Sequence, residues 1–346
     1  MDHRDGRTQE PAETLDLGPH AQRARRSLNG DDPGETGTVL PPFIDHHVHL
    51  ELFEPDHLAA GGIAAVVDLG ANPSVVARFA ARDPLPHVRF AGRFLTAPGG
   101  YPAGRSWLPA GALREVQSVP EGPAHAHGSL YDDAETAVDE QVRFGASVIK
   151  VALHAGGPAF DRATLDAVVR AAHARSRPVA VHAEGRGMAE LAIDAGADAL
   201  VHTPWTDELP PALVARAARA GQVWISTLDI HGHGAANAGA ARARANLTRF
   251  AGAGGRVVYG TDLGNGVLPI GVNAREVAAL VSAGLPAAAI VGALTDPWPH
   301  ADRAAWSMDS LATFVPGPPP TRLDELGAWL AAARVLPADG LDPLDD

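Results

Sequence analysis

The sequence contains no cysteine. Disulfide bonds and thiolate metal sites are therefore excluded, and any metal ion must be held by nitrogen and oxygen ligands. No apolar run reaches the roughly 20 residues that a membrane-spanning helix needs. The polar residues 1–38 contain no apolar stretch like that of a signal peptide. We therefore expect a cytoplasmic protein that does not bind membranes.

Positive charge is also scarce in this chain. Lys and Arg together number 28, against 41 Asp and Glu, which gives a formal net charge of −13. Surfaces that bind nucleic acid attract phosphates with an excess of basic side chains. We therefore expect no nucleic-acid partner and, instead, a small-molecule substrate. The oligomeric state is open, with a homo-oligomer among the alternatives.

Beyond residue 38, short runs rich in β-branched residues alternate with alanine-rich stretches of helical periodicity. This alternation indicates a parallel α/β architecture. The predicted strands lie within residues 39–49, 62–70, 87–95, 146–154, 177–185, 197–204, 222–228 and 255–262. Helical patterns between them include residues 161–176, 185–196, 210–221 and 237–254.

The repeats over residues 39–295 favour a (β/α)8 barrel of the TIM type, which typically needs about 250 residues. A doubly wound open sheet is the alternative, but no Gly-x-Gly-x-x-Gly turn follows a predicted strand. We interpret residues 1–38 as a polar segment, partly disordered or the remnant of a small β domain. Residues 296–346 form a C-terminal extension, with a strand at 310–317 and a helix at 325–336. Together the two ends would make a reduced side domain.

A long segment rich in glycine and proline, residues 96–131, follows the third predicted strand. Long ordered loops are often functional, and the aromatic residues Tyr101 and Trp107 favour an ordered one. In a barrel, this segment would cover the carboxyl-terminal mouth as a lid or as a wall of the substrate site.

The octet FIDHHVHL (43–50) contains three histidines within four positions. Successive side chains of a strand point to opposite faces, so Asp45, His47 and His49 share one face. Two imidazoles at i and i+2 can approach a single metal ion, whereas His46 points the other way and is interpreted as structural. Asp45 would orient one imidazole or serve as a structural carboxylate. For the octet alone, a histidine-rich turn without a ligand is the alternative.

Further polar side chains lie at the ends of other predicted strands, where the chemistry of a (β/α)8 barrel is located. They are Lys150, His182, His202 and Asp262. Each has a structural explanation by itself, since Lys150 could extend toward solvent and Asp262 could cap the next helix. Together with His47 and His49 they occupy the expected strand ends of one barrel, and we interpret the six as one site.

These motifs resemble those of the amidohydrolase superfamily, metal-dependent hydrolases built on a distorted barrel. FIDHHVH resembles the His-x-His motif of its first strand, and VIKVALH its lysine segment. AVHAEG and LVHTPW resemble its two later histidine motifs, and VVYGTDLGN its final aspartate motif. TAPGGYP, GASVIKVALHAGG and GTDLG are most similar to the imidazolonepropionase- and prolidase-like branch. The likeness spans about residues 39–295.

The resemblance implies two divalent metal ions, with Zn²⁺ as the expected metal. Lys150 would react with CO₂ and bridge both ions as a carbamate. Asp262 would also act as the catalytic acid and base, between a metal-bridging water and the leaving nitrogen. The ligands would be His47, His49 and Asp262 for one ion, and His182 and His202 for the other, with Lys150 shared.

Residues around the mouth are expected to contact the substrate, with ordinary loop packing as the alternative for each. They are Tyr101, Arg105, Trp107, His154, Arg186 and His231, with Trp205 and His233 at the same rim. Several of these side chains are cationic or histidine, which suits a substrate that carries a carboxylate.

The sequence therefore predicts a binuclear metal-dependent hydrolase. It would cleave the C–N bond of an amide or cyclic amide by attack of a metal-bridging hydroxide. One alternative keeps the metals but changes the bond to that of a lactone, carbamate or phosphotriester. The other alternative is a non-catalytic barrel that binds a ligand, against which the complete ligand set argues.

Overall fold

The computed structural model describes residues 14–27, 34–82, 86–118 and 128–344. The disorder predicted for the extreme N-terminus concerns residues 1–13, which lie outside the described residues. The strands are β1 (Gln22–Arg26), β2 (Glu35–Leu40), β3 (Phe43–Val48), β4 (Ile63–Asp68), β5 (His87–Phe90), β6 (Phe94–Thr96), β7 (Leu113–Glu115), β8 (Ile149–His154), β9 (Val179–Glu184), β10 (Ala199–Leu200), β11 (Val223–Ile225), β12 (Arg256–Val258), β13 (Leu311–Pro316), β14 (Arg334–Pro337) and β15 (Leu341–Pro343). The helices are α1 (Pro73–Ala80), α2 (Gly128–Arg143), α3 (Arg162–Ala174), α4 (Met188–Asp194), α5 (Pro211–Arg219), α6 (Ala238–Gly252), α7 (Ala274–Ser282), α8 (Ala287–Thr295) and α9 (Leu326–Leu330).

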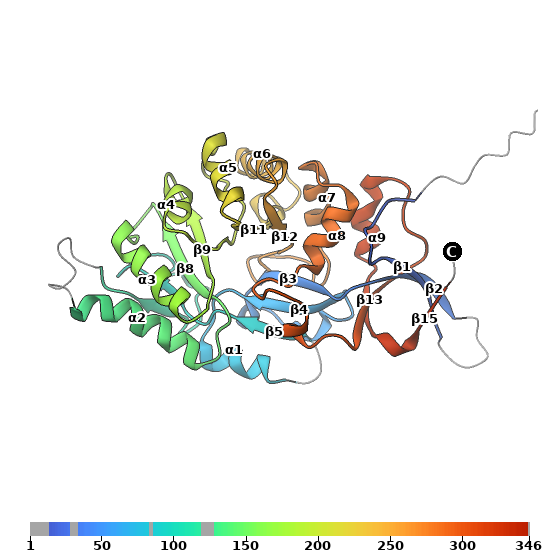
Figure 1. Ribbon diagram of the computed structural model, residues 1–346, viewed down its shortest axis with the longest axis horizontal. Coiled ribbons are helices and arrows are strands. Elements are labelled where there is room, and N and C mark those ends of the chain that lie inside the picture. Colours follow the sequence, from blue (N-terminus) through green and yellow to red (C-terminus); the bar gives the residue numbers. More distant parts are fainter. Residues whose placement is uncertain (1–13, 28–33, 83–85, 119–127, 345–346) are drawn as a thin grey trace, which may run out of the picture.

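Parallel strands flanked by helices make up the centre of the molecule (Figure 1). One sheet has the order β3-β4-β5 and the other the order β12-β11-β10-β9-β8-β6-β7. The predicted α/β class is confirmed, and each predicted strand contains a strand of the structure. The strand order shows two separate parallel sheets rather than one continuous ring. The first predicted strand is divided at Pro41 and Pro42, because proline has no N–H to donate to a sheet.

Backbone hydrogen bonds connect the two parallel sheets at two places. Just before β8, the Ser147 N–H donates to the carbonyl of Phe90 in the edge strand β5 over 2.9 Å. At the edge strands β3 and β12, the Asp262 N–H donates to the His47 carbonyl over 2.8 Å. The second bond fixes the segment after β12 against the end of β3, and so brings two predicted ligands next to each other.

The helices pack apolar faces against the sheets. In α3, the buried side chains of Leu165, Val168 and Ala172 recur at helical spacing on one face. The helix begins at Asp161, whose carboxylate accepts a hydrogen bond from the Thr164 N–H over 2.7 Å. This regular outer layer holds the strands, and therefore their carboxyl ends, in fixed positions.

Both ends of the chain contribute to an antiparallel sheet with the order β14-β13-β2-β1-β15. It lies at one end of the molecule, away from α2 and α3 (Figure 1). β13 corresponds to the strand predicted at 310–317, and β2 crosses the predicted domain boundary at residue 38. The helix predicted at 325–336 is only partly present, because its last part pairs with β13 as β14. The domain boundaries themselves stay a prediction.

The segment predicted as one long loop, residues 96–131, contains a strand. β7 lies within it and pairs in parallel with β6, with Leu95 opposite Arg114. The loop prediction is corrected here, since this segment returns to the edge of the parallel sheet and extends it. Residues 119–127 of the segment lie outside the described residues. Among the helices that the structure describes, none has the length and apolar character needed to cross a bilayer.

Candidate metal centre

A cavity of about 290 Å³ lies toward the carboxyl ends of the parallel strands. All six residues that the sequence predicts as metal ligands line it: His47, His49, Lys150, His182, His202 and Asp262. Four residues predicted around the mouth, Tyr101, Trp107, Trp205 and His231, line it as well. The remaining lining residues are Leu52, Phe94, Glu184, Ile230, Gly264, Asn265 and Gly266.

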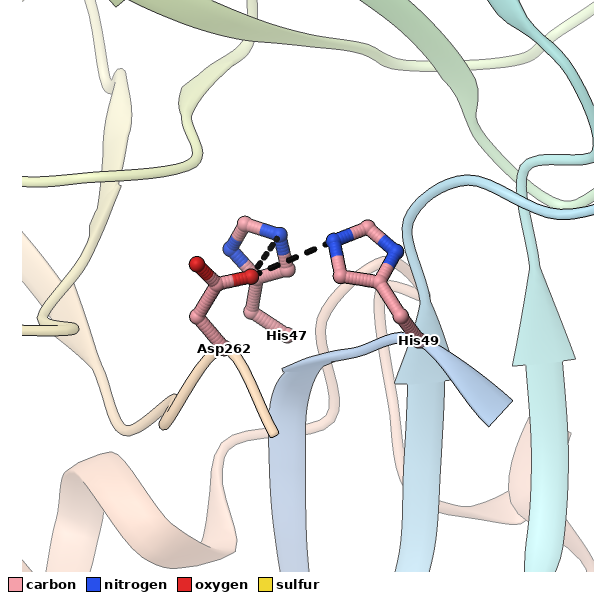
Figure 2. Close-up of side chains that lie close together, drawn as sticks. All are labelled: His47, His49 and Asp262. Atoms are coloured by element: carbon pink, nitrogen blue, oxygen red, sulfur yellow. Dashed lines mark ion pairs between the residues drawn. The ribbon is translucent and has the colours of Figure 1, made fainter. Parts of the chain in front are cut away.

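His47, His49 and Asp262 converge on one buried point (Figure 2). The Nε2 atoms of both histidines lie 3.2 Å from Asp262 Oδ1. All three side chains are buried, with at most 7% of their surface exposed. Their potential ligand atoms lie within 4.8 Å of one another. This is the spacing of atoms that share one metal ion.

The other ring nitrogens of these histidines determine which atom faces Asp262. His47 Nδ1 lies 2.9 Å from the Val201 carbonyl, and His49 Nδ1 lies 3.1 Å from the Gly70 carbonyl. A carbonyl can only accept, so each Nδ1 donates and each neutral ring keeps a lone pair on Nε2. Two such lone pairs beside a carboxylate oxygen repel one another unless a cation lies between them. The donor set therefore fits a metal ion.

Hydrogen bonding in this group is incomplete. His47 Nε2 and Asp262 Oδ1 are buried, and neither has a hydrogen-bond partner of acceptable geometry. Most buried polar atoms have such a partner, because an unsatisfied one costs free energy. A bound cation would satisfy both atoms at once, which is a second reason that the residues fit a metal.

His46 lies outside the cavity, as strand parity predicts. Its Nδ1 lies 2.7 Å from the Tyr259 carbonyl and its Nε2 lies 2.9 Å from the Asp296 carbonyl. Burial lowers the pKa of His46, and a neutral imidazole has a single N–H. Only one of the two contacts is therefore a hydrogen bond at a time, and the residue joins β3 to the segments after β12 and α8.

Asp45 has a structural role. Its carboxylate accepts hydrogen bonds from the His47 N–H over 3.1 Å, and from the Thr261 N–H and hydroxyl over 3.0 and 2.5 Å. The alternative in which Asp45 orients an imidazole is corrected, because its oxygens bind the backbone and a hydroxyl instead. These bonds fix the end of β3 against the segment that carries Asp262.

Lys150 is 1% exposed and lines the cavity. Burial lowers the pKa of its amine to about 7, against an ordinary value of 10.5. Its Nζ lies 5.7 Å from the centre of the Phe94 ring. At neutral pH a large fraction of this amine is therefore uncharged, and an uncharged amine is a nucleophile.

His182 and His202 lie beside the His47 group. Their ring centres are 5.0 Å apart, and the His202 ring centre lies 4.7 Å from that of His47. His202 Nδ1 lies 2.9 Å from the Thr227 hydroxyl, which leaves its Nε2 free for a ligand. In the part of the chain that the structure describes, the two histidines do not complete a second group of three ligand atoms.

Two residues of the site have left-handed backbone conformations. Asp262 has a φ of 60° and Thr227, which contacts His202, has a φ of 41°. Residues other than glycine rarely adopt such angles, and those that do often belong to functional sites. Here the two positions are Asp262, itself a candidate ligand, and Thr227, whose hydroxyl contacts the candidate ligand His202.

Aromatic rings form the walls of the cavity. Tyr101 stacks on the rings of His154 and His182, at centroid distances of 5.3 and 4.9 Å. The ring centres of Trp107 and Tyr101 are 6.2 Å apart, and Trp107 is 38% exposed at the rim. Trp205 stacks on His231, with their ring centres 4.7 Å apart.

Four residues predicted around the mouth do not line the cavity. The Arg105 guanidinium lies 5.5 Å from the centre of the Tyr101 ring, on the exposed rim. His154 Nε2 lies 3.3 Å from a carboxylate oxygen of Glu184. Arg186 and His233 are exposed. The two arginines that were expected to bind a substrate carboxylate therefore lie outside the lining.

Sequence reasoning missed Glu184 and Asn265. Glu184 follows His182 by two residues on β9, so both side chains share one face, and strand parity could have identified it. Its Oε2 lies 3.2 Å from His182 Nε2, and this hydrogen bond lowers the pKa of Glu184. Asn265 donates to Asp262 Oδ2 over 2.8 Å, a contact that the turn sequence alone does not reveal.

Comparison with known proteins gives a fold relationship. No protein-family model matches the chain, and no curated protein matches its sequence. A solved Xaa-Pro dipeptidase with methionine bound in its active site matches with a TM-score of 0.63 and 19% identity, covering 89% of this chain and 87% of that chain. The A. niger ochratoxinase matches with a TM-score of 0.62 and 21% identity, covering 85% and 81%. A putative prolidase from Bifidobacterium longum matches with a TM-score of 0.62 and 20% identity, covering 89% and 81%. The chain therefore has the fold of these structures.

Proposed function

We propose that the protein is a metal-dependent hydrolase of the amidohydrolase superfamily that cleaves the C–N bond of an amide or cyclic amide. The observation that carries the proposal is the convergence of His47, His49 and Asp262 on one buried point, in a cavity shared with Lys150. The fold that the chain shares with a dipeptidase and a prolidase supports an amide as the substrate. The substrate would be a small molecule, and neither nucleic acid nor a membrane is a proposed partner.

The proposed architecture is a distorted (β/α)8 barrel. The hydrogen bonds from Ser147 to Phe90 and from Asp262 to His47 connect the two parallel sheets at two places, as neighbouring strands of a barrel would be connected. The antiparallel sheet formed by the chain ends would be its reduced side domain. Location in the cytoplasm and assembly into a homo-oligomer remain predictions.

The proposed centre holds two divalent ions, and a donor set of imidazole and carboxylate suits Zn²⁺. When bound, the ions would polarise the amide carbonyl and lower the pKa of a water molecule. The residues that would hold them are His47, His49 and Asp262 for one ion, His182 and His202 for the other, and a carbamate of Lys150 for both.

The composition of the chain supports the carbamate. Lys150 is the only lysine in the sequence, so all the other residues in the combined count of Lys and Arg are arginines. Arginine replaces lysine easily on a surface, but its guanidinium does not lose a proton in proteins. A buried lysine in a chain that otherwise uses arginine therefore favours a role that needs an uncharged amine. Reaction of that amine with CO₂ gives an anion, which a cationic centre would stabilise.

Asp262 would transfer the proton in the reaction. Its carboxylate accepts a proton from the attacking water and donates it to the nitrogen that leaves. The hydrogen bond from Asn265 to Oδ2 holds the carboxylate with Oδ1 directed at His47 and His49. The aromatic walls limit access of bulk water, which strengthens electrostatic interactions in the cavity.

Hydrolysis assays test the proposal. Zinc-loaded protein would be incubated with N-acyl amino acids, dipeptides and cyclic amides, and the released amine would be measured. We expect turnover that Asp262→Asn lowers by about 100-fold or more, whereas Asp339→Asn, an exposed control, leaves it unchanged. Hydrolysis of lactones, carbamates or phosphotriesters but not amides would favour the first alternative. Full metal content without turnover of either group would favour the non-catalytic barrel.

A further inference from the structure

We infer that the substrate carries a positively charged group near the bond that is cleaved, and that Glu184 binds this group between aromatic walls. The inference rests on the proposed function and specifies its substrate class. The group would be an ammonium, a guanidinium or a quaternary amine. Such a substrate is opposite in charge to the carboxylate-bearing one that the sequence favoured.

The charges of the cavity lining lead to this conclusion. Among the described residues that line the cavity, the side chains of the Lys, Arg, Asp and Glu classes are Lys150, Glu184 and Asp262. Lys150 and Asp262 belong to the proposed metal centre. Glu184 is therefore the charged side chain of the lining that remains for the substrate, and its charge is negative. An anionic substrate would meet repulsion at this position, while a cationic one would be attracted.

Glu184 is placed to contact a bound molecule. It lies on the same face of β9 as His182, and its side chain is 32% exposed. Its two oxygens lie 3.2 Å from His182 Nε2 and 3.3 Å from His154 Nε2. A carboxylate has room for about four hydrogen bonds, so these two contacts orient the group and leave it able to accept more.

The aromatic residues next to Glu184 favour the same charge. The Tyr101 ring stacks on that of His182 with their centres 4.9 Å apart, and the Trp205 ring meets the same ring edge-on with the centres 5.7 Å apart. Trp107 extends the Tyr101 wall toward the rim. The faces of Tyr and Trp rings attract cations, most strongly when these are partly desolvated. A carboxylate between such rings is complementary to an organic cation.

The basic residues near the mouth do not oppose this inference. The Arg105 guanidinium lies over the Tyr101 ring at 5.5 Å and is exposed, and Arg186 is exposed as well. Neither contributes to the lining of the cavity. His231 lines it, but burial lowers the pKa of its imidazole to about 4, so it carries no charge at neutral pH. Glu184 is therefore the charged side chain of the described lining that lies outside the proposed metal centre.

Binding of three probes of similar size tests the inference. Benzylammonium, benzyl alcohol and benzoate would be titrated into zinc-loaded protein at neutral pH by calorimetry. We expect benzylammonium to bind about tenfold more tightly than benzyl alcohol, as a hydrogen bond to a charged group allows. In Glu184→Gln, which keeps the shape and removes the charge, the two should bind equally. Glu190→Gln, an exposed control on α4, should keep the preference.

The metal content of each variant would be measured in the same samples. We expect Glu184→Gln to retain as much zinc as the wild type, because the glutamine oxygen can still accept the hydrogen bond from His182. A loss of zinc would show that Glu184 serves the metal centre, as a ligand or through His182, and would overturn the inference. Equal binding of benzylammonium and benzyl alcohol by the wild type would also overturn it. If benzoate bound most tightly of the three probes and Arg105→Gln abolished that binding, the result would favour a substrate that carries a carboxylate, as the sequence predicted.

The two proposals fail independently. Amide hydrolysis without a preference for cationic probes or substrates would leave the proposed function in place and overturn this inference. A cation preference that depends on Glu184, in a protein that hydrolyses no amide, would overturn the proposed function alone.

Discussion

At the scale of single residues, the candidate centre depends on the second nitrogen of each imidazole. His47, His49 and His202 each use Nδ1 in a contact with an oxygen of the protein, so that Nε2 is left for a ligand. The three oxygens belong to two backbone carbonyls and one hydroxyl. Ring orientation is therefore fixed before any ion binds, which lowers the cost of ordering the ligands.

Metal content should separate the three histidines of FIDHHVHL. We expect His47→Asn and His49→Asn each to lose about one ion per chain, because each removes one of the few ligands of that ion. His46→Asn should retain the wild-type content and lose only stability, through its contacts with carbonyls. Elemental analysis of the purified variants measures this. Loss of metal in His46→Asn with full content in His49→Asn would contradict the proposed ligand set.

The single lysine allows a direct test of the carbamate. Protein equilibrated with ¹³C-bicarbonate should show one carbonyl signal of a carbamate in its ¹³C spectrum, since burial lowers the Lys150 pKa to about 7 and leaves uncharged amine available. Lys150→Arg should lose this signal, together with metal and activity, because a guanidinium forms no such adduct. A signal that persists in Lys150→Arg would come from the N-terminal amine and would contradict the bridging role.

At the scale of elements, α7 holds the segment that brings His231 into the cavity. The Glu276 carboxylate accepts hydrogen bonds from the Leu228 and Asp229 N–H groups, over 3.0 and 2.7 Å. The Arg275 guanidinium lies 2.9 Å from the Asp229 carboxylate. The turn after β11 is therefore fastened to a helix that follows it by more than 40 residues. Glu276 is 0% exposed, so these bonds are not shared with water.

Stability should depend on pH through Glu276. Burial raises its pKa to about 7, from an ordinary value of 4.5. At this position the folded protein therefore holds a proton that the unfolded chain releases, so the contribution of Glu276 to stability falls as the pH rises from about 4.5 toward about 7. Glu276→Gln should lower the free energy of unfolding by roughly 1–3 kcal/mol, because an amide has a single acceptor oxygen for two N–H groups.

The loss caused by Glu276→Gln should shrink between pH 5 and pH 8, because the amide does not titrate. Urea denaturation of both proteins at several pH values measures the difference. The exposed Glu190→Gln serves as the control and should show no such trend. A difference that stays constant or widens with pH would contradict the assigned protonation of Glu276.

At the scale of the whole molecule, the first and last strands of the chain form one sheet. β2 pairs with β13, and β1 pairs with β15, so that Ala24, for example, lies opposite Pro343. The sheet also contacts the parallel strands, since the N–H of Phe43 in β3 donates to the Thr313 hydroxyl of β13 over 3.1 Å. Unfolding of this sheet should therefore be coupled to that of the centre.

Phe314 tests that coupling, because its side chain is 0% exposed in β13. We expect Phe314→Ala to lower the free energy of unfolding by about 3–5 kcal/mol, through lost burial and the cavity left behind. Thermal and urea denaturation should still show a single transition. Val267→Ala, at a position that is 93% exposed, should change stability by no more than about 0.5 kcal/mol. A separate early transition in Phe314→Ala would show that the sheet unfolds independently.

The sequence by itself determined the α/β class, the positions of most strands and helices, and the set of polar side chains at the strand ends. These features follow from periodicities of two and 3.6 residues, which are local and can be recognised without knowing the partners. Parity on β3 likewise separated His46 from His47 and His49. The same rule applied to β9 would have added Glu184, which shares a face with His182.

Only the tertiary structure decided how those side chains act together. The ring of His47 is oriented by the carbonyl of Val201, 154 residues away, and the separation of β14 from α9 depends on pairing with β13. The packing of the rim segments likewise decided that, among the described residues, no arginine lines the cavity. Such contacts join segments that are distant in the chain, and their free energy depends on the packing of the whole fold, so no local pattern records them.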